Sequence, residues 1–427
     1  MKKKRREEEL PPFENEAKKV RVSSLAERNE RRREYKDAIY YEKITEEKLD
    51  TAKPLKKGGV DMWFLLWSMV LLCFGIVMCY SAGAFDASMN YDDSTYYLLR
   101  NILFSVVAVG VTIPFVIWAR PWFWRAFGIG AYGAAIVLLI AVLLVGKTGG
   151  GAERWIDLGF ITVQPSEIAK LAIVMVLALY LEKHEKQVNS LQKFGGHFRY
   201  AVLYPILTFG LICALVMLEH HLSGIIIIGV MGLATMYIGG TDKKWFMWIG
   251  GIGIVAVLAV LLVSDYAMLR VTTWLNIENV DPLGSAWQTL QGLNAIGSGG
   301  FFGRGLGNSQ QKYGYVSQPQ NDFIFTIVCE ELGFVGALAV VLLFGLLVWR
   351  GFRIASKAPD KFSSIVAYGL ITKVALQAIL NIAVVTNSIP NTGIALPFFS
   401  SGGTSLILQI FEMGLVLSIS RYSYEKR

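Results

Sequence analysis

Charged side chains within apolar stretches are the first candidates for chemistry in this chain. Gln164-Pro165-Ser166-Glu167 opens one such stretch, which also carries Lys170. Glu167 and Lys170 are three residues apart, so on a helix they share a face and can pair. Proline suits a first helical turn, and a helix N-terminus favours a nearby anion. We therefore expect an anion-binding helix end, in which Glu167 orients Lys170. The alternative is a purely structural pair that closes the helix end.

Two segments outside the apolar stretches also carry candidate groups. Arg154-Trp155 lies within residues 146–165, and an arginine beside an aromatic ring at a membrane surface suits a diphosphate or sugar headgroup. The alternative is a tryptophan that only anchors the chain at the interface. Residues 297–314 are rich in glycine and include Arg304 and Lys312. Glycines let a backbone approach phosphate closely, although such a loop can also be merely flexible.

Four more charged residues fall within apolar runs: Glu330, Glu331, Lys373 and Glu412. Charges inside a membrane span are costly, so they are candidates for function. They could equally pair with one another and hold a helical bundle together. Both interpretations stay open at this stage.

The elements that must position these residues follow from composition. Hydrophobic residues make up 54% of the 427 residues and charged residues 17%, against about 25% charged in soluble proteins. Residues 1–60 hold 18 of the 41 Lys and Arg residues, so the remainder is poorer still in charge. This excludes a single soluble domain, an extended disordered chain and a nucleic-acid-binding domain.

The sequence therefore predicts an all-α polytopic integral membrane protein. A span needs about 20 apolar residues. About ten candidates occur, at 62–80, 101–118, 127–145, 166–181, 200–218, 222–239, 245–264, 323–349, 364–386 and 402–419. Lys and Arg cluster in alternate connections, which places both termini in the cytoplasm. We predict a charged tail at 1–60, a membrane domain at 61–421 and a short cytoplasmic end at 422–427. A large extracytoplasmic loop, 265–322, would join the seventh and eighth helices.

Five dispersed motifs resemble the SEDS family, the shape, elongation, division and sporulation proteins that include FtsW, RodA and SpoVE. The resemblance covers roughly residues 62–420. The motifs are Gly151-Ala-Glu-Arg-Trp-Ile-Asp-Leu-Gly, Gln164-Pro-Ser-Glu-Ile-Ala-Lys, Asp281-Pro-Leu-Gly, Asn321-Asp-Phe-Ile-Phe with Glu330-Glu-Leu-Gly, and Asn391-Thr-Gly-Ile-Ala-Leu-Pro with Ser401-Gly-Gly-Thr-Ser. The last of these is nearer to the division and sporulation branches than to the elongation branch.

The resemblance implies a ten-helix peptidoglycan glycosyltransferase of the bacterial cytoplasmic membrane. It would polymerise lipid II, an undecaprenyl-diphosphate-linked disaccharide peptide, beside a class B penicillin-binding protein transpeptidase. Other proteins of the division or elongation complex would also be partners. Nucleic acid is not expected as a partner. Asp281 would be the catalytic residue, and the substrate-binding residues would be Arg154, Trp155, Gln164, Glu167, Lys170 and Gln288.

The expected reaction inverts the configuration at the anomeric carbon of the donor sugar, from α-linked to β-linked, and releases a lipid diphosphate. One carboxylate acting as general base, Asp281, would take the acceptor proton, a step worth about 10²–10⁴ in rate. Arg154 and Lys170, with Arg304 as a lesser candidate, would offset charge on the departing diphosphate. A divalent cation, Mg²⁺ or Mn²⁺, could share that role, but no ligand cluster demands one.

One segment departs from the family pattern. Many members carry Gln-Pro-Asp-Leu-Gly-Thr between the fifth and sixth helices, whereas this chain reads Glu219-His220-His221-Leu222-Ser223-Gly224. The expected acidic side chain is absent at His221, although Glu219 could substitute nearby. We therefore leave this hairpin out of the predicted site.

Two other functions remain as alternatives. A lipid II flippase would use the buried charges to line a headgroup path, but it needs no carboxylate in an outer loop. A non-enzymatic scaffold of the division or elongation complex would act through the tail and the helix faces. Synthesis of polymer from lipid II by detergent-solubilised protein would separate the enzyme from both.

Overall fold

The structure is a computed structural model that describes residues 59–422, except 120, 150–151, 158, 160–161, 190–192, 220, 264 and 278–285. Most of the predicted tail, residues 1–58, therefore lies outside the described residues. The helices are α3 (Met62–Tyr91), α4 (Tyr96–Trp118), α5 (Pro121–Val145), α6 (Pro165–Lys183), α7 (Glu185–Val188), the π-helix η1 (Lys193–Leu203), α8 (Tyr204–Leu218), α9 (Leu222–Gly239), α10 (Lys243–Val263), α11 (Asp265–Leu275), α12 (Trp287–Gly299), α13 (Ile324–Ser356), α14 (Lys361–Val385) and α15 (Gly403–Ser420). The strands are β1 (Lys147–Gly149), β2 (Ala152–Asp157) and β3 (Thr162–Val163).

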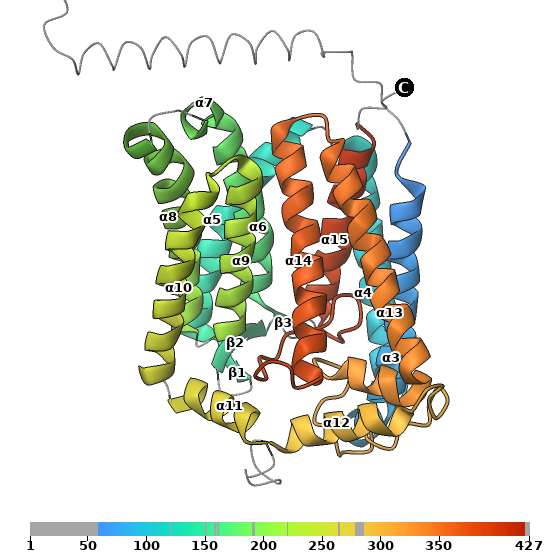
Figure 1. Ribbon diagram of the computed structural model, residues 1–427. Coiled ribbons are helices and arrows are strands. Elements are labelled where there is room, and N and C mark those ends of the chain that lie inside the picture. Colours follow the sequence, from blue (N-terminus) through green and yellow to red (C-terminus); the bar gives the residue numbers. More distant parts are fainter. Residues whose placement is uncertain are drawn as a thin grey trace, which may run out of the picture.

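The long helices stand side by side as an upright bundle (Figure 1). Among the described residues, eight helical segments are long and apolar enough to cross a membrane, and each overlaps a predicted span. Helices α6 and α10 occupy the two remaining predicted positions. Helix α6 carries four charged residues, which lowers its hydropathy. The chain is therefore a polytopic helical protein. That it has ten membrane spans remains a prediction.

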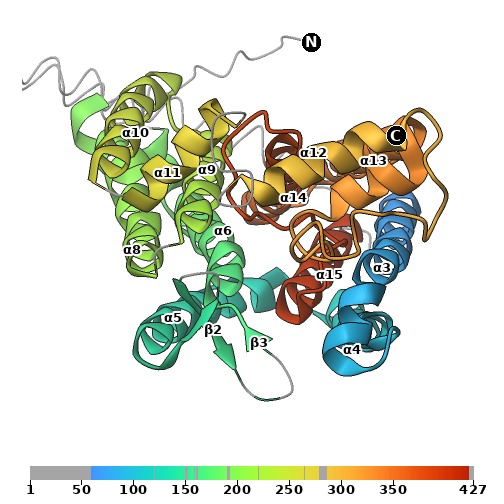
Figure 2. The same ribbon diagram turned by 90° about the horizontal axis from the view of Figure 1, so that it is seen from below.

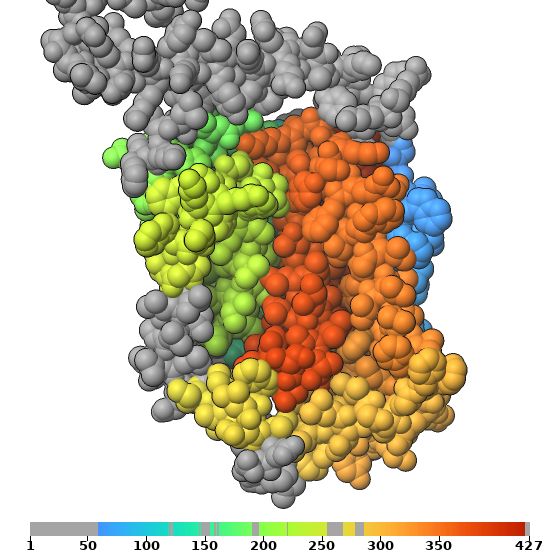
Figure 3. Space-filling view, in the orientation of Figure 1, coloured from blue at the N-terminus to red at the C-terminus, as the bar shows by residue number. Residues whose placement is uncertain are grey.

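Helix α6 lies at the centre of the site described below. It packs against α5, α9 and α14, and α14 in turn packs against α9, α13 and α15. Seen from below, α11 and α12 lie across the end of the bundle that also carries the strands (Figure 2). We call this the outer end, because the sequence predicts that it faces away from the cytoplasm. In the space-filling view, α9 and α14 adjoin along the length of the bundle (Figure 3).

Charged side chains fix two helix starts at the opposite, inner end. The Asp61 carboxylate accepts a hydrogen bond from the backbone N–H of Phe64, and Asp360 accepts one from Ser363. Such N-caps satisfy backbone donors that have no partner in the helix. Asp61 also pairs with Arg350 of α13 at 2.8 Å. The first span is thereby tied to a helix almost 300 residues further along the chain.

Three predicted connections are shorter or more ordered than the sequence indicated. The connection expected at 81–100 is short, because α3 continues to Tyr91 and only residues 92–95 form a turn before α4. The connection expected at 146–165 contains a three-stranded antiparallel sheet. The predicted loop 265–322 contains α11 and α12. Residues 81–90 looked polar enough for a loop, yet Ser81 donates to Glu331, and Asp86 accepts from Tyr97. Polar partners elsewhere in the fold thus allow this stretch to remain helical.

A break in α13 fixes the glycine-rich segment against the bundle. Gly333 has φ 67° and ψ −166° inside the helix. A β-carbon there would lie 2.3 Å from the backbone nitrogen of Gly303. The positive φ and this close approach both require glycine. The backbone N–H groups of Arg304 and Gly305 then donate to the carbonyls of Glu330 and Glu331.

Candidate functional site

The first two turns of α6 carry a buried ion pair at the outer end. Lys170 Nζ lies 2.5 Å from Oε1 of Glu167, and the two side chains are 3% and 10% exposed. The pairing that the three-residue spacing predicts is therefore present. Because each charge is removed from water, each compensates the other, and removal of one would leave an unpaired buried charge.

A second lysine reaches the same carboxylate from α14. Lys373 Nζ lies 3.7 Å from Oε2 of Glu167 and 2.7 Å from Oε1 of Glu412 in α15. The four side chains Lys170, Glu167, Lys373 and Glu412 thus alternate in charge across three helices. All four are at most 10% exposed. For Lys373 and Glu412, this is the structural pairing that the sequence left open.

The strands position Arg154 and Trp155 next to α6. Strand β2 pairs with β1 on one side and β3 on the other, with Trp155 opposite Lys147 and Ile156 opposite Val163. Strand β3 leads directly into Gln164, which is half-buried at the N-cap position of α6. Thr404, at the start of α15, donates a hydrogen bond to the Thr162 carbonyl. The sheet is therefore held against both helices.

The hairpin between α8 and α9 joins this cluster, although the sequence analysis left it out. His221 Nδ1 lies 3.4 Å from Oγ of Ser166, and both side chains are buried. Burial, together with the positive charges of Lys170 and Arg154, lowers the pKa of His221 to about 3. Its imidazole is therefore neutral at physiological pH.

Glu219 of the same hairpin is buried beside Arg154. Its side chain is 1% exposed, and among the described residues neither carboxylate oxygen has a hydrogen-bond partner. Burial raises the pKa of Glu219 to about 8, and the Arg154 charge opposes that rise only in part. We name Glu167, Lys170, Arg154, Glu219 and His221 the α6 cluster.

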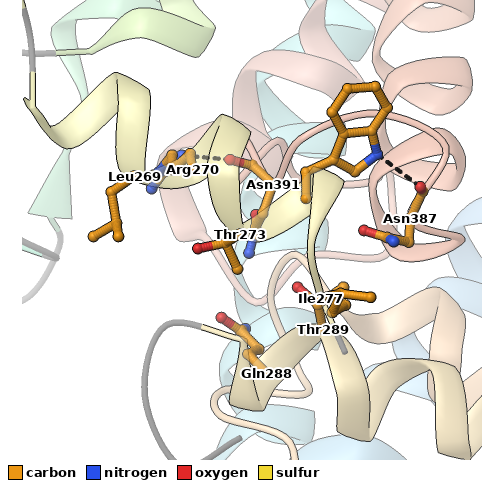
Figure 4. Close-up of a pocket in the computed structure, with 9 residues that line it drawn as sticks. Leu269, Arg270, Thr273, Ile277, Gln288, Thr289, Asn387 and Asn391 are labelled. Atoms are coloured by element: carbon orange, nitrogen blue, oxygen red, sulfur yellow. Dashed lines mark hydrogen bonds between the residues drawn. The ribbon is translucent and has the colours of Figure 1, made fainter. Parts of the chain in front are cut away.

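A second group of polar residues surrounds a cavity at the outer end (Figure 4). It has a volume of about 230 Å³ and lies between α11, α12 and residues 387–391. Gln288 lines it, and its Nε2 donates to the Ser317 carbonyl at 3.0 Å. Arg270 also lines it and donates to the Asn391 carbonyl at 2.7 Å. The predicted catalytic residue, Asp281, belongs to residues 278–285 between α11 and α12, outside the described residues.

Asp322, whose carboxyl group is affected by the charge of the cavity-lining Arg270, was not among the predicted site residues. Burial raises the pKa of Asp322 to about 6, and the Arg270 charge opposes the rise. A carboxyl group with a raised pKa that interacts with a cavity-lining arginine is a candidate functional group. Two signals could have identified these residues: Arg270 stands in an amphipathic stretch, and Asp322 lies in the Asn321-Asp-Phe-Ile-Phe motif.

Two consecutive residues connect the cavity to the α6 cluster. The Asn391 carbonyl accepts from Arg270 of α11, and the Thr392 carbonyl accepts from Ser223 of α9 at 2.5 Å. Ser223 lies two residues after His221. The segment after α14 therefore bridges the two groups of polar residues.

Arg304 lies apart from both groups of polar residues. Its Nη1 is 3.5 Å from Oε1 of Glu330, and its side chain is 35% exposed. Lys312 pairs with Glu331 at 3.0 Å, where both side chains are buried. The glutamates of α13 are thus matched by cations of the glycine-rich segment. These contacts hold that segment in place.

The described part of the chain contains no group of side chains arranged as metal ligands. No three His, Cys, Asp or Glu side chains are grouped so that they could hold an ion. Asp281 lies outside that part.

Comparison with known proteins gives consistent matches. The model of a family described as cell cycle proteins, FtsW, RodA and SpoVE, matches residues 62–425. Stage V sporulation protein E of Bacillus subtilis is 38% identical over 86% of this chain and 99% of its own length. A probable peptidoglycan glycosyltransferase FtsW of Trichlorobacter lovleyi is 34% identical over 86% and 95%.

Solved structures share the fold. A chain from a structure that describes polymerisation and crosslinking by a peptidoglycan synthase complex superposes with a TM-score of 0.68 and 26% identity, over 86% of this chain and 99% of that one. The rod shape determining protein RodA of Thermus thermophilus gives a TM-score of 0.63 at 24% identity, over 86% and 98%.

Proposed function

Because this chain belongs to the FtsW, RodA and SpoVE family of cell cycle proteins, we propose that it is a peptidoglycan glycosyltransferase that polymerises lipid II. It is a multi-pass protein of the bacterial cytoplasmic membrane. The observation that carries the proposal is the α6 cluster, where Lys170 and Arg154 supply cations at the outer end of a largely apolar bundle.

The donor diphosphate would bind between these cations. Lys170 and Arg154 both act electrostatically on His221, so they approach a common region. A preorganised cation in a site with little water stabilises developing negative charge far better than one in bulk solvent. Glu167 would orient Lys170 and stay away from the substrate, because a second anion beside a diphosphate would repel it.

Asp281 would act as the general base. The glycan acceptor must lose a hydroxyl proton as it attacks the donor sugar, while the lipid diphosphate leaves with the bonding electron pair. A carboxylate within hydrogen-bond reach of that hydroxyl takes the proton. Gln288 is the second residue of α12, seven positions after Asp281 in the sequence, and it lines the outer cavity. It would help to orient the acceptor.

The partner in this reaction would be a penicillin-binding protein of class B. A similar chain was solved as part of a peptidoglycan synthase complex, in which polymerisation and crosslinking are coordinated. The relatives include a sporulation protein and probable FtsW enzymes. Division or sporulation is therefore the process we propose.

Transport receives less support from these contacts. A flippase would need buried charges that line a headgroup path. Lys373 pairs with Glu412, and Lys312 pairs with Glu331, so these charges have protein partners and need no substrate.

The test is polymerisation in detergent, where no second compartment exists. Wild-type protein, purified with class B penicillin-binding proteins from the same organism, is given lipid II, and glycan strands are resolved on a gel. We expect strands from the wild type and none from Asp281→Ala. Asp92→Asn is the matched control, because Asp92 is an exposed outer carboxylate in a left-handed conformation that asparagine also adopts.

Normal strands from Asp281→Ala would refute the assignment of the base. Absence of strands from the wild type with every class B partner would refute the enzymatic function itself.

A further inference from the structure

Glu219 is a buried carboxyl group beside Arg154 whose two oxygens take part in no hydrogen bond among the described residues. It ends α8, is 1% exposed, and has no hydrogen-bond partner for either carboxylate oxygen among the residues described. The other buried glutamates differ: Glu167, Glu331 and Glu412 each contact a lysine within 3.0 Å, and Glu330 accepts a hydrogen bond from Ser309. A buried carboxyl group without a partner is costly unless it is neutral or meets a ligand.

The hairpin that carries Glu219 is joined to its neighbours by two side-chain contacts and lies next to a cation. The hairpin is fixed to α6 by the contact between His221 and Ser166, and to residues 387–402 by the bond from Ser223 to Thr392. Arg154 of β2 is the charge that acts on Glu219. The other titratable groups of the cluster are His221, Lys170 and Glu167. The described side chains at the outer end of α5 and in the first two turns of α9 include no titratable group.

The ionisation states follow from burial. The raised pKa of Glu219, about 8, keeps it as the neutral acid at pH 7, and neutral His221 adds no charge. An oxyanion beside Arg154 would therefore meet one cation and one O–H donor from these two side chains, without repulsion from Glu219. Ionised Glu219 would instead place a negative charge next to that oxyanion.

We propose that Glu219 is a substrate-binding residue, which donates its carboxylic acid proton in a hydrogen bond to a phosphate oxygen of the lipid-linked donor bound beside Arg154. This inference rests on the proposed glycosyltransferase function and adds a binding group that the sequence analysis left out. Glutamine at the same position would keep an N–H donor without an ionisable proton. Alanine would remove the donor.

The test is the pH dependence of KM for lipid II between pH 6.5 and 9.5. In the wild type, KM should rise about tenfold one pH unit above the pKa of Glu219, because only about a tenth of the side chain then remains protonated. Glu219→Gln should have a near wild-type KM at pH 7 and lack that rise. Glu219→Ala should have a KM raised about tenfold already at pH 7. Asp92→Asn should follow the wild-type curve throughout.

Direct binding provides a second measurement that does not need catalysis. Lipid II carries a diphosphate diester that stays ionised across this range, so its affinity for wild-type protein should fall at high pH while its affinity for Glu219→Gln stays constant. The same alkaline loss in Glu219→Gln, or an unchanged KM in Glu219→Ala, would overturn the assignment of Glu219. Failure of the wild type to make any polymer would instead refute the proposed function, and this inference with it.

Discussion

Lys373 of α14 and Glu412 of α15 form a buried ion pair, with Nζ 2.7 Å from Oε1 and 2.9 Å from Oε2. The two side chains are 1% and 0% exposed. Lys373 also lies 3.7 Å from Glu167, so the pair lies next to the α6 cluster without being part of it. Its role is to hold three helices together around Glu167.

Breaking this pair from one side should destabilise the protein strongly. Lys373→Met leaves Glu412 buried without its partner, a change that costs about 3–5 kcal/mol in other proteins. The double variant Lys373→Met with Glu412→Gln removes both charges and should recover most of that loss. Thermal unfolding in detergent measures both. Equal destabilisation in the single and double variants would show that the two residues do not act as a pair.

Lys170 should matter for activity through its charge. Lys170→Met removes the cation from the second turn of α6 and should lower polymerisation about 100-fold, a loss typical of removing one stabilising donor from an active site. Lys170→Arg keeps the charge and should retain part of the activity. Lys183→Met is the matched control, because Lys183 is exposed in the last turn of the same helix.

The outcome that contradicts this role is unchanged lipid II binding and polymerisation in Lys170→Met. The contact between Glu167 and Lys170 would then be structural only, and the diphosphate would bind elsewhere.

Arg304 should contribute little to catalysis. It is partly exposed and lies 3.5 Å from Glu330, in a segment that the α13 glutamates hold in place. Interactions of partly exposed charges are worth about 0–1 kcal/mol, so Arg304→Met should change kcat/KM by less than about fivefold. A loss as large as that of Lys170→Met would move the diphosphate site to the glycine-rich segment.

Asp322 should make stability depend on pH in the acidic range. Its pKa is raised from 3.8 to about 6 by burial, so the folded state holds the proton more tightly than the unfolded state. Its contribution therefore favours folding below pH 3.8 and is lost as the pH rises to about 6. Unfolding of the wild type and Asp322→Asn, compared at pH 4 and 7, should show the wild type gaining stability relative to the variant at pH 4. An equal difference at both pH values would contradict the raised pKa.

The sequence by itself determined the long apolar helices and their order. Long runs of apolar residues are driven out of water, and in lipid their backbone N–H and C=O groups must be hydrogen-bonded within the helix. Length and hydropathy therefore locate spans without reference to other parts of the chain. The pairing of Glu167 with Lys170 was equally accessible, because helical geometry sets which residues three apart share a face. The family motifs identified Arg154, Gln164, Gln288 and Asp281 as candidates.

Tertiary structure decided which distant groups meet. The contact of Lys373 with both Glu167 and Glu412, and the fixation of the α8–α9 hairpin through Ser166 and Thr392, join segments that are up to about 245 residues apart. No local period encodes such contacts, since they depend on which helix faces are packed together. The tertiary structure also shows that the Glu219 carboxyl group is buried without a hydrogen-bond partner among the described residues, because its surroundings depend on every element packed around it. For that reason the hairpin left out of the predicted site became part of it.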